Sequence, residues 1–524
     1  MTSRSLAHPV ATIRACEQVL LDAQPEPDHL MRQAAHAVAV AADALLSDVE
    51  APEIRLLVGA GGNGGDALYA GAELAASHGG RGVHAILLGR EGRVHERALA
   101  AFEEAGGVVV RHLPPQPAGD LIIDGVLGIG GAGGLSPELG AWLRRAREEA
   151  IPVLAVDVPS GVDADTGALP EHHVTADVTV TFGGLRLAHA VGNACGEILV
   201  ADIANGEDSL GDALAREVLE GRSPYVLVLR ALAPSRDWPL PLHAPHTPEW
   251  SGPLEPGAGD DKYSGGVVGL CAGSGTYPGA AVLTALGAVR ATSAMVRYVG
   301  PLGRDVVRAV PEVVISATVA DTGRVQAWVV GPGRGEDASE LEELLARPEP
   351  LLVDADAITL LARSPELRSA LRAREGDTLL TPHAGEFRRL ADAVGGLPDV
   401  TADPLGAVQA LAEDLRCEVL LKGRRTILWT GGRIVTVDAG SSWAATPGSG
   451  DVLAGIAGAW IARAGMPGVV EAVAVHGVAT WLSAQTPDGP APTSASRIAE
   501  AVPQATARLS RGRRQAENRA THEG

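Results

Sequence analysis

The stretch of sequence that decides the fold of the second half lies at residues 447–455 and reads PGSGDVLAG. Its glycines let backbone N–H groups crowd at the start of the apolar run 452–464, which has the composition of a buried helix. A helix N-terminus attracts anions, because its unpaired N–H groups and its dipole both favour negative charge. Asp451 is therefore well placed to act as a base for a substrate hydroxyl that attacks phosphorus. An ordinary helix cap is the alternative interpretation of this aspartate.

Four further polar loops precede this helix, each directly after an apolar run that is typical of a buried strand. They read GPGRG at 331–335, DADA at 354–357, TPHAGE at 381–386 and LKGRRT at 421–426. In open α/β sheets, ligands bind at the carboxyl ends of the strands. The last loop is basic and contains glycine, which suits nucleotide phosphates, and it carries one of only two lysines among the 43 basic residues. The sequence therefore predicts a nucleotide-dependent site in this half.

The first half also opens with a glycine loop. The sequence GAGGNGGD at 59–66 follows the apolar run 54–58 and precedes an alanine-rich helical stretch at 67–77. A strand, a glycine loop and a helix in this order begin a parallel βαβ unit. Further apolar runs between breakers predict strands at 83–88, 121–123, 153–156, 178–182 and 197–201. Helices are expected upstream, between residues 13 and 46.

A second α/β series begins at residue 266, after a proline-rich stretch. Residues 233–261 contain seven prolines and show no periodicity, which indicates a linker. Buried strands are then expected at 267–270, 327–330, 351–353, 378–380 and 419–421, with a hairpin at Gly431-Gly432. The fold class is therefore α/β with two doubly wound domains. We expect these domains at residues 1–212 and 262–510, separated by a linker at 213–261 and followed by a disordered tail at 511–524.

Charge and cysteine content indicate the cellular compartment of the chain and the partners that it does not bind. The net charge of −21 argues against a general nucleic-acid or membrane-surface binder, which needs a basic field. The four cysteines are far apart and show no CxxC spacing, so a disulfide framework or zinc cluster is not expected. No signal-peptide core and no apolar run of membrane-spanning length stands out. We therefore expect a cytoplasmic protein that binds neither nucleic acid nor membrane. Assembly as a homo-oligomer is a separate expectation.

The second half resembles the ribokinase-fold dehydratase family that repairs hydrated NADH and NADPH. The motifs occur in the family's order: KxxxGxVxxxxGS at 262–274, then the four loops above, then GxGDVLAG at 448–455. The resemblance covers residues 262–507. It departs from the family pattern at Pro447 and Ser449, where glycine and threonine are usual, and across 439–446.

This resemblance implies roles for individual residues of the second half. Asp451 would be the base or the substrate-contacting acid, and Gly450 would form the anion hole over the transferred phosphate. Residues along the ADP would be Lys422, Gly423, Arg424, Arg425 and Thr426. The hydrated nicotinamide nucleotide would contact His383, Ala280, Gly335 and Asp451. Mg²⁺ would bridge the phosphates of ADP, the phosphoryl donor, and the products would be NAD(P)H, AMP and phosphate.

Polar side chains also follow neighbouring strands in the first half. Asp124 ends the apolar run 121–123, and VDVPSGVD at 156–163 ends the next strand. Oxygens of Asn, Asp and Ser at adjacent strand ends can together hold a monovalent cation or an activated water. Capping of the loops by the same side chains is the alternative interpretation.

The first half resembles the NAD(P)H-hydrate epimerase domain, the usual fusion partner of that dehydratase, over residues 13–205. The motifs are NGGD at 63–66, DxxxGxG at 124–130, VDxPSGxDADTG at 156–167 and TFGxxR at 181–186. The resemblance implies K⁺ ligands at Asn63, Asp124 and Ser160, with Asp124 also moving the proton in epimerisation. Substrate would contact Gly62, Asn63, Gly64, Gly65, Asp66, Gly128, Ile129, Gly130, Gly131, Ala132, Gly133, Gly134 and Asp157. Gly62 replaces a usual asparagine, and the 128–134 loop lacks the basic residue expected beside the phosphates.

The two resemblances together predict a two-domain repair enzyme. It would interconvert the R and S forms of hydrated NAD(P)H and dehydrate the S form with ADP. The alternative is a ribokinase-like, vitamin-type kinase joined to a non-catalytic nucleotide-binding module. In either case the expected architecture is a Rossmann-like three-layer sandwich followed by a ribokinase-like three-layer sandwich.

Overall fold

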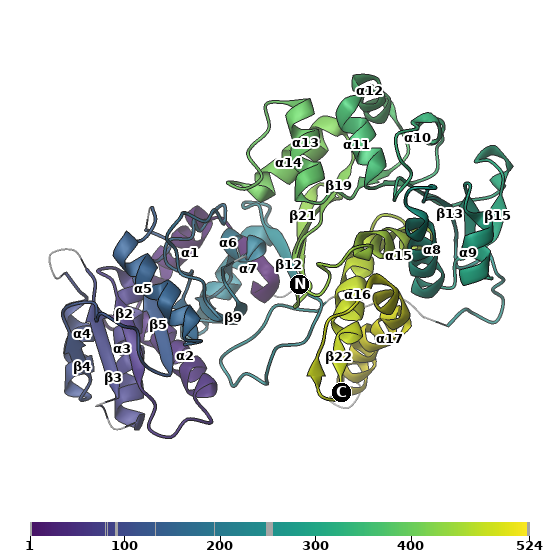
Figure 1. The fold of residues 1–524 in the computed structure, drawn as a ribbon. Coiled ribbons are helices and arrows are strands. Elements are labelled where there is room, and N and C mark those ends of the chain that lie inside the picture. The colour runs from purple at the N-terminus through teal and green to yellow at the C-terminus, as the bar shows by residue number, and fades with distance from the viewer. Residues whose placement is uncertain are drawn as a thin grey trace. The chain divides into compact units, whose positions relative to one another are not determined.

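A computed structural model describes residues 3–78, 80, 82–89, 93–131, 133–192, 194–247 and 255–520, with only the backbone given for residues 3 and 511–520. The chain divides into two compact units (Figure 1). Unit 1 comprises Met1–Val228, Pro234–His246 and Thr401–Pro404. Unit 2 comprises Leu229–Ala233, Thr247–Val400 and Leu405–Gly524.

Unit 1 is built on a parallel sheet of seven strands in the order β4-β3-β2-β5-β6-β7-β9. The strands are β2 (Ile54–Val58), β3 (Val83–Leu87), β4 (Val108–Val110), β5 (Leu121–Gly125), β6 (Val153–Val156), β7 (Val178–Phe182) and β9 (Glu197–Ala201). Their order reverses beside β2 and β5, which places the two glycine-rich loops after these strands at the topological switch point.

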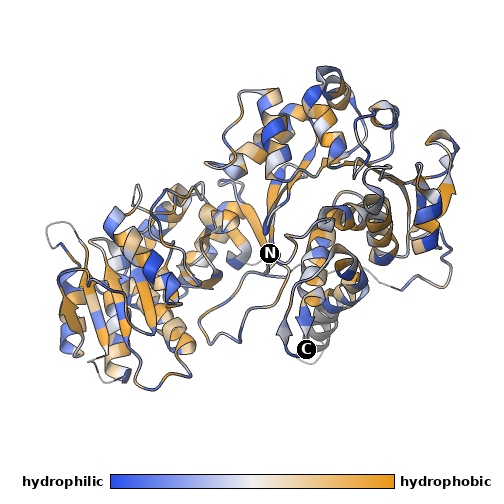
Figure 2. Cartoon of the chain, viewed as in Figure 1, coloured by the Kyte–Doolittle hydropathy of each residue, from blue (hydrophilic) through white to orange (hydrophobic). Residues whose placement is uncertain are grey.

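Side chains of this sheet alternate between two apolar cores, so helices cover both faces. From β2, Ile54 and Leu56 enter the core shared with α2 (His29–Leu45), α3 (Gly62–His78) and α4 (Glu96–Glu104). Leu57 enters the opposite core with Trp142 of α5 (Pro137–Glu148). Figure 2 shows the strands as mainly hydrophobic. This arrangement confirms the predicted three-layer sandwich.

Smaller elements complete unit 1 and shorten the predicted linker. Helix α1 (Val10–Asp22) follows β1 (Leu6–His8), which pairs with β8 (Leu185–Arg186) and with the start of β12 (Val226–Arg230). Helix α6 (Leu187–Val191) follows β8, the two-residue strands β10 (Ala204–Asn205) and β11 (Asp208–Ser209) pair with each other, and α7 (Leu210–Leu219) follows them. Residues 213–230 were expected in the linker but form much of α7 and β12, because Ser209 caps α7 and Val226 and Val228 are buried.

Unit 2 is built on a second, mostly parallel sheet. The order within this unit is β15-β14-β13-β16-β17-β18-β19-β20-β21, with β20 and β21 antiparallel. The strands are β13 (Val267–Cys271), β14 (Met295–Val299), β15 (Val314–Ser316), β16 (Ala327–Val330), β17 (Leu351–Val353), β18 (Thr378–Leu380), β19 (Glu418–Leu421), β20 (Arg425–Thr430) and β21 (Arg433–Asp438). The predicted hairpin at Gly431-Gly432 joins β20 to β21.

Helices cover both faces of this sheet as well (Figure 1). One group contains α10 (Ser339–Leu345), α11 (Asp356–Arg363), α12 (Pro365–Ala373), α13 (Ala384–Val394) and α14 (Pro404–Leu415). The other contains α8 (Pro278–Ala291), α15 (Ser449–Ala464), α16 (Gly468–Ser483) and α17 (Ala495–Ala520), and α9 (Gly303–Ala309) lies beside β15. Helices α8 and α15 touch through their backbones: a Cβ on Gly455 would lie 2.0 Å from the carbonyl oxygen of Thr284, and one on Gly287 would lie 2.4 Å from that of Val452.

Several expectations need correction or completion. Residues 62–66 and 449–451 form the first turns of α3 and α15 rather than loops. Gly64 packs against the backbone of Gly59, and Gly448 begins α15 in a left-handed conformation. Residues 511–520 continue α17 where a disordered tail was predicted, and residues 521–524 lie outside the described part. All four cysteines are free. Within the described ranges, no helix has the length and apolar character needed to cross a membrane.

Candidate functional site

Asp451 lies in the first turn of α15, at the carboxyl edge of the unit 2 sheet. Gly448 precedes the helix with a φ of 82°, a left-handed conformation that glycine adopts without strain. Burial and the carboxylate of Asp354 raise the pKa of Asp451 to about 6, although the ammonium of Lys422 opposes the shift. A carboxylate with a pKa near 6 can accept a proton at neutral pH and hold it more tightly than an ordinary aspartate.

Lys422 connects three elements of this edge. Its Nζ lies 2.6 Å from Oδ1 of Asp354, which directly follows β17. A Cβ on Gly450 would lie 3.4 Å from the same Nζ, so the ammonium sits against the start of α15. Burial alone would lower the pKa of Lys422, but the carboxylates of Asp354 and Glu386 raise it above its ordinary value. Lys422 therefore remains a cation beside Asp451.

A pocket of about 380 Å³ opens at this point. Its lining residues are Tyr277, Gly279, Ala280, Leu283, Gly333, Asp356, Pro447, Gly448 and Asp451. Asp356 begins α11, and its Oδ2 accepts a hydrogen bond of 2.8 Å from the backbone N–H of Gly335. The structure thus places Ala280 and Asp451 in the lining of one pocket, and Gly335 is hydrogen-bonded to the lining residue Asp356. Contact of these residues with the nicotinamide nucleotide stays a prediction.

His383 stands beside Lys422 rather than among the residues that line the pocket. The backbone N–H of Lys422 donates to the carbonyl of Pro382 at 2.8 Å, so the ends of β18 and β19 are adjacent. The imidazole of His383 is 57% exposed, accepts from the N–H of Gly385 through Nδ1, and lies 3.3 Å from Glu386 through Nε2. It caps α13 and presents an open face to a ligand.

The other predicted nucleotide residues lie in the turn into β20. Arg424 is half exposed, and its Nε lies 3.7 Å from Oδ1 of Asp438. Arg425 is buried, with its guanidinium 3.1 Å from Oδ2 of the same carboxylate. The hydroxyl of Thr426 is buried near the carbonyl oxygen of Gly423. Arg425 therefore holds the hairpin together, and its contact with a nucleotide stays a prediction.

Sequence reasoning missed His476, which supports the start of α15 from α16. Its Nε2 lies 3.1 Å from both the hydroxyl and the carbonyl oxygen of Ser449. Burial lowers the pKa of His476 to about 4, so the ring is neutral at pH 7. The available signal was a lone imidazole in the otherwise apolar stretch 472–480.

In unit 1, Asp124 and Ser160 form a buried pair at the ends of β5 and β6. The Ser160 hydroxyl donates to Oδ1 of Asp124 at 2.6 Å, and the Ser160 backbone N–H donates to Oδ2 at 2.8 Å. Burial raises the pKa of Asp124 to about 6 despite these hydrogen bonds. Asp124 can therefore gain and lose a proton near neutral pH, as an acid–base residue must.

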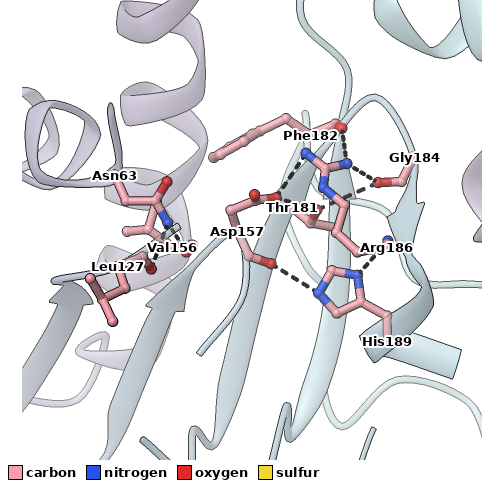
Figure 3. Close-up of polar contacts among 9 residues, drawn as sticks. All are labelled: Asn63, Leu127, Val156, Asp157, Thr181, Phe182, Gly184, Arg186 and His189. Carbon is pink, nitrogen blue, oxygen red and sulfur yellow. Dashed lines mark hydrogen bonds and ion pairs between the residues drawn. The ribbon is translucent and has the colours of Figure 1, made fainter. Parts of the chain in front are cut away.

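Asn63 joins this pair through the backbone of Leu127. Its Nδ2 donates to the carbonyl oxygens of Val156 at 2.6 Å and Leu127 at 3.3 Å (Figure 3). The Ser160 hydroxyl lies 3.2 Å from the same Leu127 oxygen. A Cβ on Gly128 would lie 2.3 Å from Oδ1 of Asn63, so glycine is required for this approach. The three predicted K⁺ ligands thus surround one stretch of backbone.

Asp157 is held by a network that the motif alone did not reveal (Figure 3). Its Oδ1 lies 2.9 Å from Nη2 of Arg186 and accepts a hydrogen bond of 2.8 Å from the hydroxyl of Thr181. Nε2 of His189 lies 2.9 Å from the Asp157 carbonyl oxygen. Asp157 has a φ of 64°, so this network fixes an uncommon backbone conformation at the predicted substrate site.

The remaining predicted residues of unit 1 lie on α3 and on the loop after β5. Gly62, Gly64, Gly65 and Asp66 belong to the first turns of α3. Burial, with the nearby carboxylates of Asp157 and Glu17, raises the pKa of Asp66 well above its ordinary value. In the loop, Gly131 donates a backbone hydrogen bond to Gly128 at 2.8 Å. Ala132 lies outside the described residues.

No group of three or more His, Cys, Asp and Glu side chains with metal-binding geometry occurs in the described ranges. The polar groups near Leu127 are instead the carboxylate of Asp124, the hydroxyl of Ser160 and the amide of Asn63, whose Nδ2 faces the Leu127 carbonyl and whose Oδ1 lies beside Gly128. The oxygens of such groups suit a weakly held monovalent cation better than a transition metal.

Comparison with known proteins agrees with both resemblances. The family model for NAD(P)H-hydrate dehydratase matches residues 268–503, and that for the YjeF-related protein N-terminus matches residues 27–188. The bifunctional NAD(P)H-hydrate repair enzyme of Corynebacterium glutamicum is 46% identical, over 95% of this chain and 98% of its own. That of Mycobacterium leprae is 42% identical, over 95% and 99%. A solved ADP/ATP-dependent NAD(P)H-hydrate dehydratase from Bacillus subtilis, co-crystallised with ATP/Mg²⁺, is 25% identical over 49% of this chain and 94% of its own, with a TM-score of 0.41.

Both halves thus match in the predicted order, and the whole-length relatives carry the same fusion. The chain belongs to the family of bifunctional NAD(P)H-hydrate repair enzymes.

Proposed function

We propose that unit 2 dehydrates hydrated NAD(P)H with ADP, and that unit 1 interconverts the two epimers of that substrate. The observation that carries the first part is the placement of Asp451 and Lys422 at the start of α15, beside the pocket. A base, a fixed cation and a helix N-terminus at one point are what transfer of a phosphoryl group to a hydroxyl requires.

The chemistry of unit 2 proceeds in two stages. Asp451 takes the proton of the substrate hydroxyl, whose oxygen attacks the β-phosphorus of ADP while the bond to the AMP oxygen breaks. Lys422 and the N–H groups of α15 stabilise the charge on the transferred group. The ring-nitrogen lone pair then expels phosphate, and loss of a proton from the neighbouring ring carbon restores the dihydropyridine.

Mg²⁺ also suits this pocket, because Asp356 presents a carboxylate among its lining residues and Mg²⁺ binds carboxylate and phosphate oxygens. Asp356 would hold the ion, which would neutralise phosphate charge. Lys422, Gly423 and Arg424 lie along the ADP in this proposal, with Gly450 beneath the transferred phosphate.

The test of unit 2 is recovery of the reduced-nicotinamide absorbance from the S epimer of hydrated NADH. We expect recovery with a nucleoside phosphate and Mg²⁺, and a loss of at least about a hundredfold in an Asp451→Asn variant. Asp305→Asn is the matched control, because Asp305 is an exposed aspartate in the first turn of α9. ADP and ATP are compared side by side. No recovery with either nucleotide would refute the dehydratase and leave a vitamin-type kinase as the better account.

In unit 1, Asp124 moves the proton that ring opening and closure at the hydroxyl-bearing carbon require. The oxygens of Asn63, Asp124 and Ser160 would hold K⁺, which would supply a fixed positive charge beside this buried carboxylate. Gly62–Asp66, the 128–134 loop and Asp157 form the surface on which the nucleotide lies.

The test of unit 1 uses a mixture of both epimers with the chain's own dehydratase. The wild type should recover all of the absorbance, whereas Asp124→Asn should stop at the share of the S epimer, under conditions where spontaneous epimerisation is slow. K⁺ should raise the rate of the epimer-limited phase relative to Na⁺ at equal ionic strength. Full recovery at the wild-type rate in Asp124→Asn would make unit 1 a non-catalytic module. Homo-oligomeric assembly and a cytoplasmic location stay predictions.

A further inference from the structure

Helix α1 reaches the loops at the carboxyl edge of the unit 1 sheet from far away in the sequence. The backbone N–H of Val10 donates to Oδ1 of Asp165 at 2.7 Å, in the turn that follows β6. One turn later, Nη2 of Arg14 donates to the carbonyl oxygen of Ile129 at 3.1 Å, in the loop that follows β5. The helix therefore places an arginine directly on the predicted substrate loop.

The contact between Arg14 and this loop depends on a missing side chain. A Cβ on Gly130 would lie 3.0 Å from Nη2 of Arg14. The guanidinium thus lies against the bare backbone of Gly130. Arg14 is exposed, and a guanidinium has five N–H donors, so several remain for a ligand after the bond to Ile129.

An anionic ligand at the 128–134 loop needs a positive charge close by. The 128–134 loop carries no basic residue. Acidic groups lie nearby: burial and the carboxylate of Asp157 raise the pKa of Glu17 on α1 and of Asp66 on α3, whereas the charge of Arg14 lowers the pKa of Glu17. Arg186, a second arginine close to Asp157, is buried and paired with that carboxylate. Arg14 is an exposed cation that already touches the loop.

We propose that Arg14 is the phosphate-binding residue of unit 1: its guanidinium and the backbone of residues 128–131 hold a phosphate group of the hydrated nucleotide. The proposal rests on the epimerase function proposed above. It assigns to α1 the charge that is missing from the loop itself. A guanidinium binds phosphate oxygens through two parallel N–H bonds, which fixes orientation as well as adding affinity.

The experiment compares three substitutions in the full-length chain. Arg14→Ala removes the charge and the donor, Arg14→Gln keeps an N–H donor for Ile129 without the charge, and Arg14→Lys keeps the charge. We expect the KM of epimerisation to rise about tenfold or more in the Ala and Gln variants, with kcat within about twofold, and the Lys variant to recover most of the loss. Arg144→Ala, an exposed arginine on α5, is the control for net charge.

A comparison of hydrated NADH with hydrated NADPH identifies which phosphate group contacts Arg14. An equal rise in KM for hydrated NADH and NADPH supports contact with the pyrophosphate, and a rise for hydrated NADPH alone supports contact with its 2′-phosphate. Wild-type kinetics in Arg14→Gln would overturn the proposal, because a merely loop-positioning arginine needs only the hydrogen bond. Dehydration of the S epimer is the internal control, since it should not change in any Arg14 variant. Failure of the proposed function is distinct: the wild type itself would then show no epimerisation.

Discussion

Substitutions of two charged neighbours of Asp451, Asp354 and Lys422, should shift its pKa in opposite directions. The carboxylate of Asp354 raises the pKa of Asp451, whereas the ammonium of Lys422 lowers it. Asp354→Asn removes the repulsion and also frees Lys422 to turn toward Asp451, so the pKa should fall. Lys422→Met removes the cation, so the pKa should rise.

The size of the effect follows from the wild-type value. Asp451 must be ionised to act as a base. The kcat/KM for dehydration should therefore decrease as the pH is lowered below the Asp451 pKa of about 6. A charge within a few ångströms shifts a carboxyl pKa by about one unit or more. The acidic limb should therefore lie near pH 5 in Asp354→Asn and near pH 7 in Lys422→Met, each as an order-of-magnitude estimate. At pH 5 the ionised fraction then rises from about a tenth to about a half, a gain of about fivefold relative to each enzyme's plateau.

The assay is the rate of absorbance recovery from the S epimer of hydrated NADH between pH 4.5 and pH 8. Each profile is normalised to its own plateau, because both substitutions also lower the absolute rate. Asp305→Asn should reproduce the wild-type limb. Limbs that stay together in the two variants, or that move in the same direction, would refute Asp451 as the titrating base.

Three further predictions concern unit 1. Burial raises the pKa of Asp124 to about 6, so its ionisation costs stability as the pH rises from about 4 through 6. Because Asp124→Asn does not ionise, its free energy of unfolding relative to that of the wild type should increase by up to about 3 kcal/mol between pH 4 and pH 7 without K⁺. A difference in urea unfolding that is equal at pH 4 and pH 7 would contradict this. Gly64→Ala should disrupt α3 and abolish epimerisation, because its Cβ would lie 2.2 Å from the carbonyl oxygen of Gly59, whereas Gly61→Ala meets no atom within 4 Å and should retain activity in the same assay. Arg186→Met should lower the free energy of unfolding by about 3 kcal/mol or more, because it leaves the buried carboxylate of Asp157 without its ion pair, and a loss below about 1 kcal/mol in urea unfolding would exclude that role.

The strands that could be predicted are those with uninterrupted apolar runs. Strands β6, β16 and β17 are buried along their whole length, and their sequences consist of apolar residues alone. Strand β14 was missed because Arg297 interrupts its apolar run. In the structure, Nη1 of that guanidinium donates to the carbonyl oxygen of Thr322 at 2.6 Å, in a strand next to the edge strand β15. Only the fold supplies such a partner.

The residues of the candidate site divide in the same way, into those that local motifs reveal and those that only the fold brings together. Motifs located Asp451, Lys422 and Asp124, because glycine loops after strands are visible in the sequence. The pairing of Lys422 with Asp354, across 68 positions, depends on which strands become neighbours. The contacts of Arg14 and His476 depend further on how α1 and α16 pack, and no local pattern encodes them. The scarcity of lysine was the useful signal for Lys422.

The backbone contact between α8 and α15 has a consequence for any attempt to enlarge the pocket. Ala280 and Leu283 come from α8 and Asp451 comes from α15, so the two helices form adjoining walls. Gly287 and Gly455 already bring these walls to contact distance, and neither position tolerates a side chain. A design that aims to admit a bulkier substrate should therefore leave the α8–α15 contact unchanged. The exposed side chain of Tyr277, at the rim, is the place to begin.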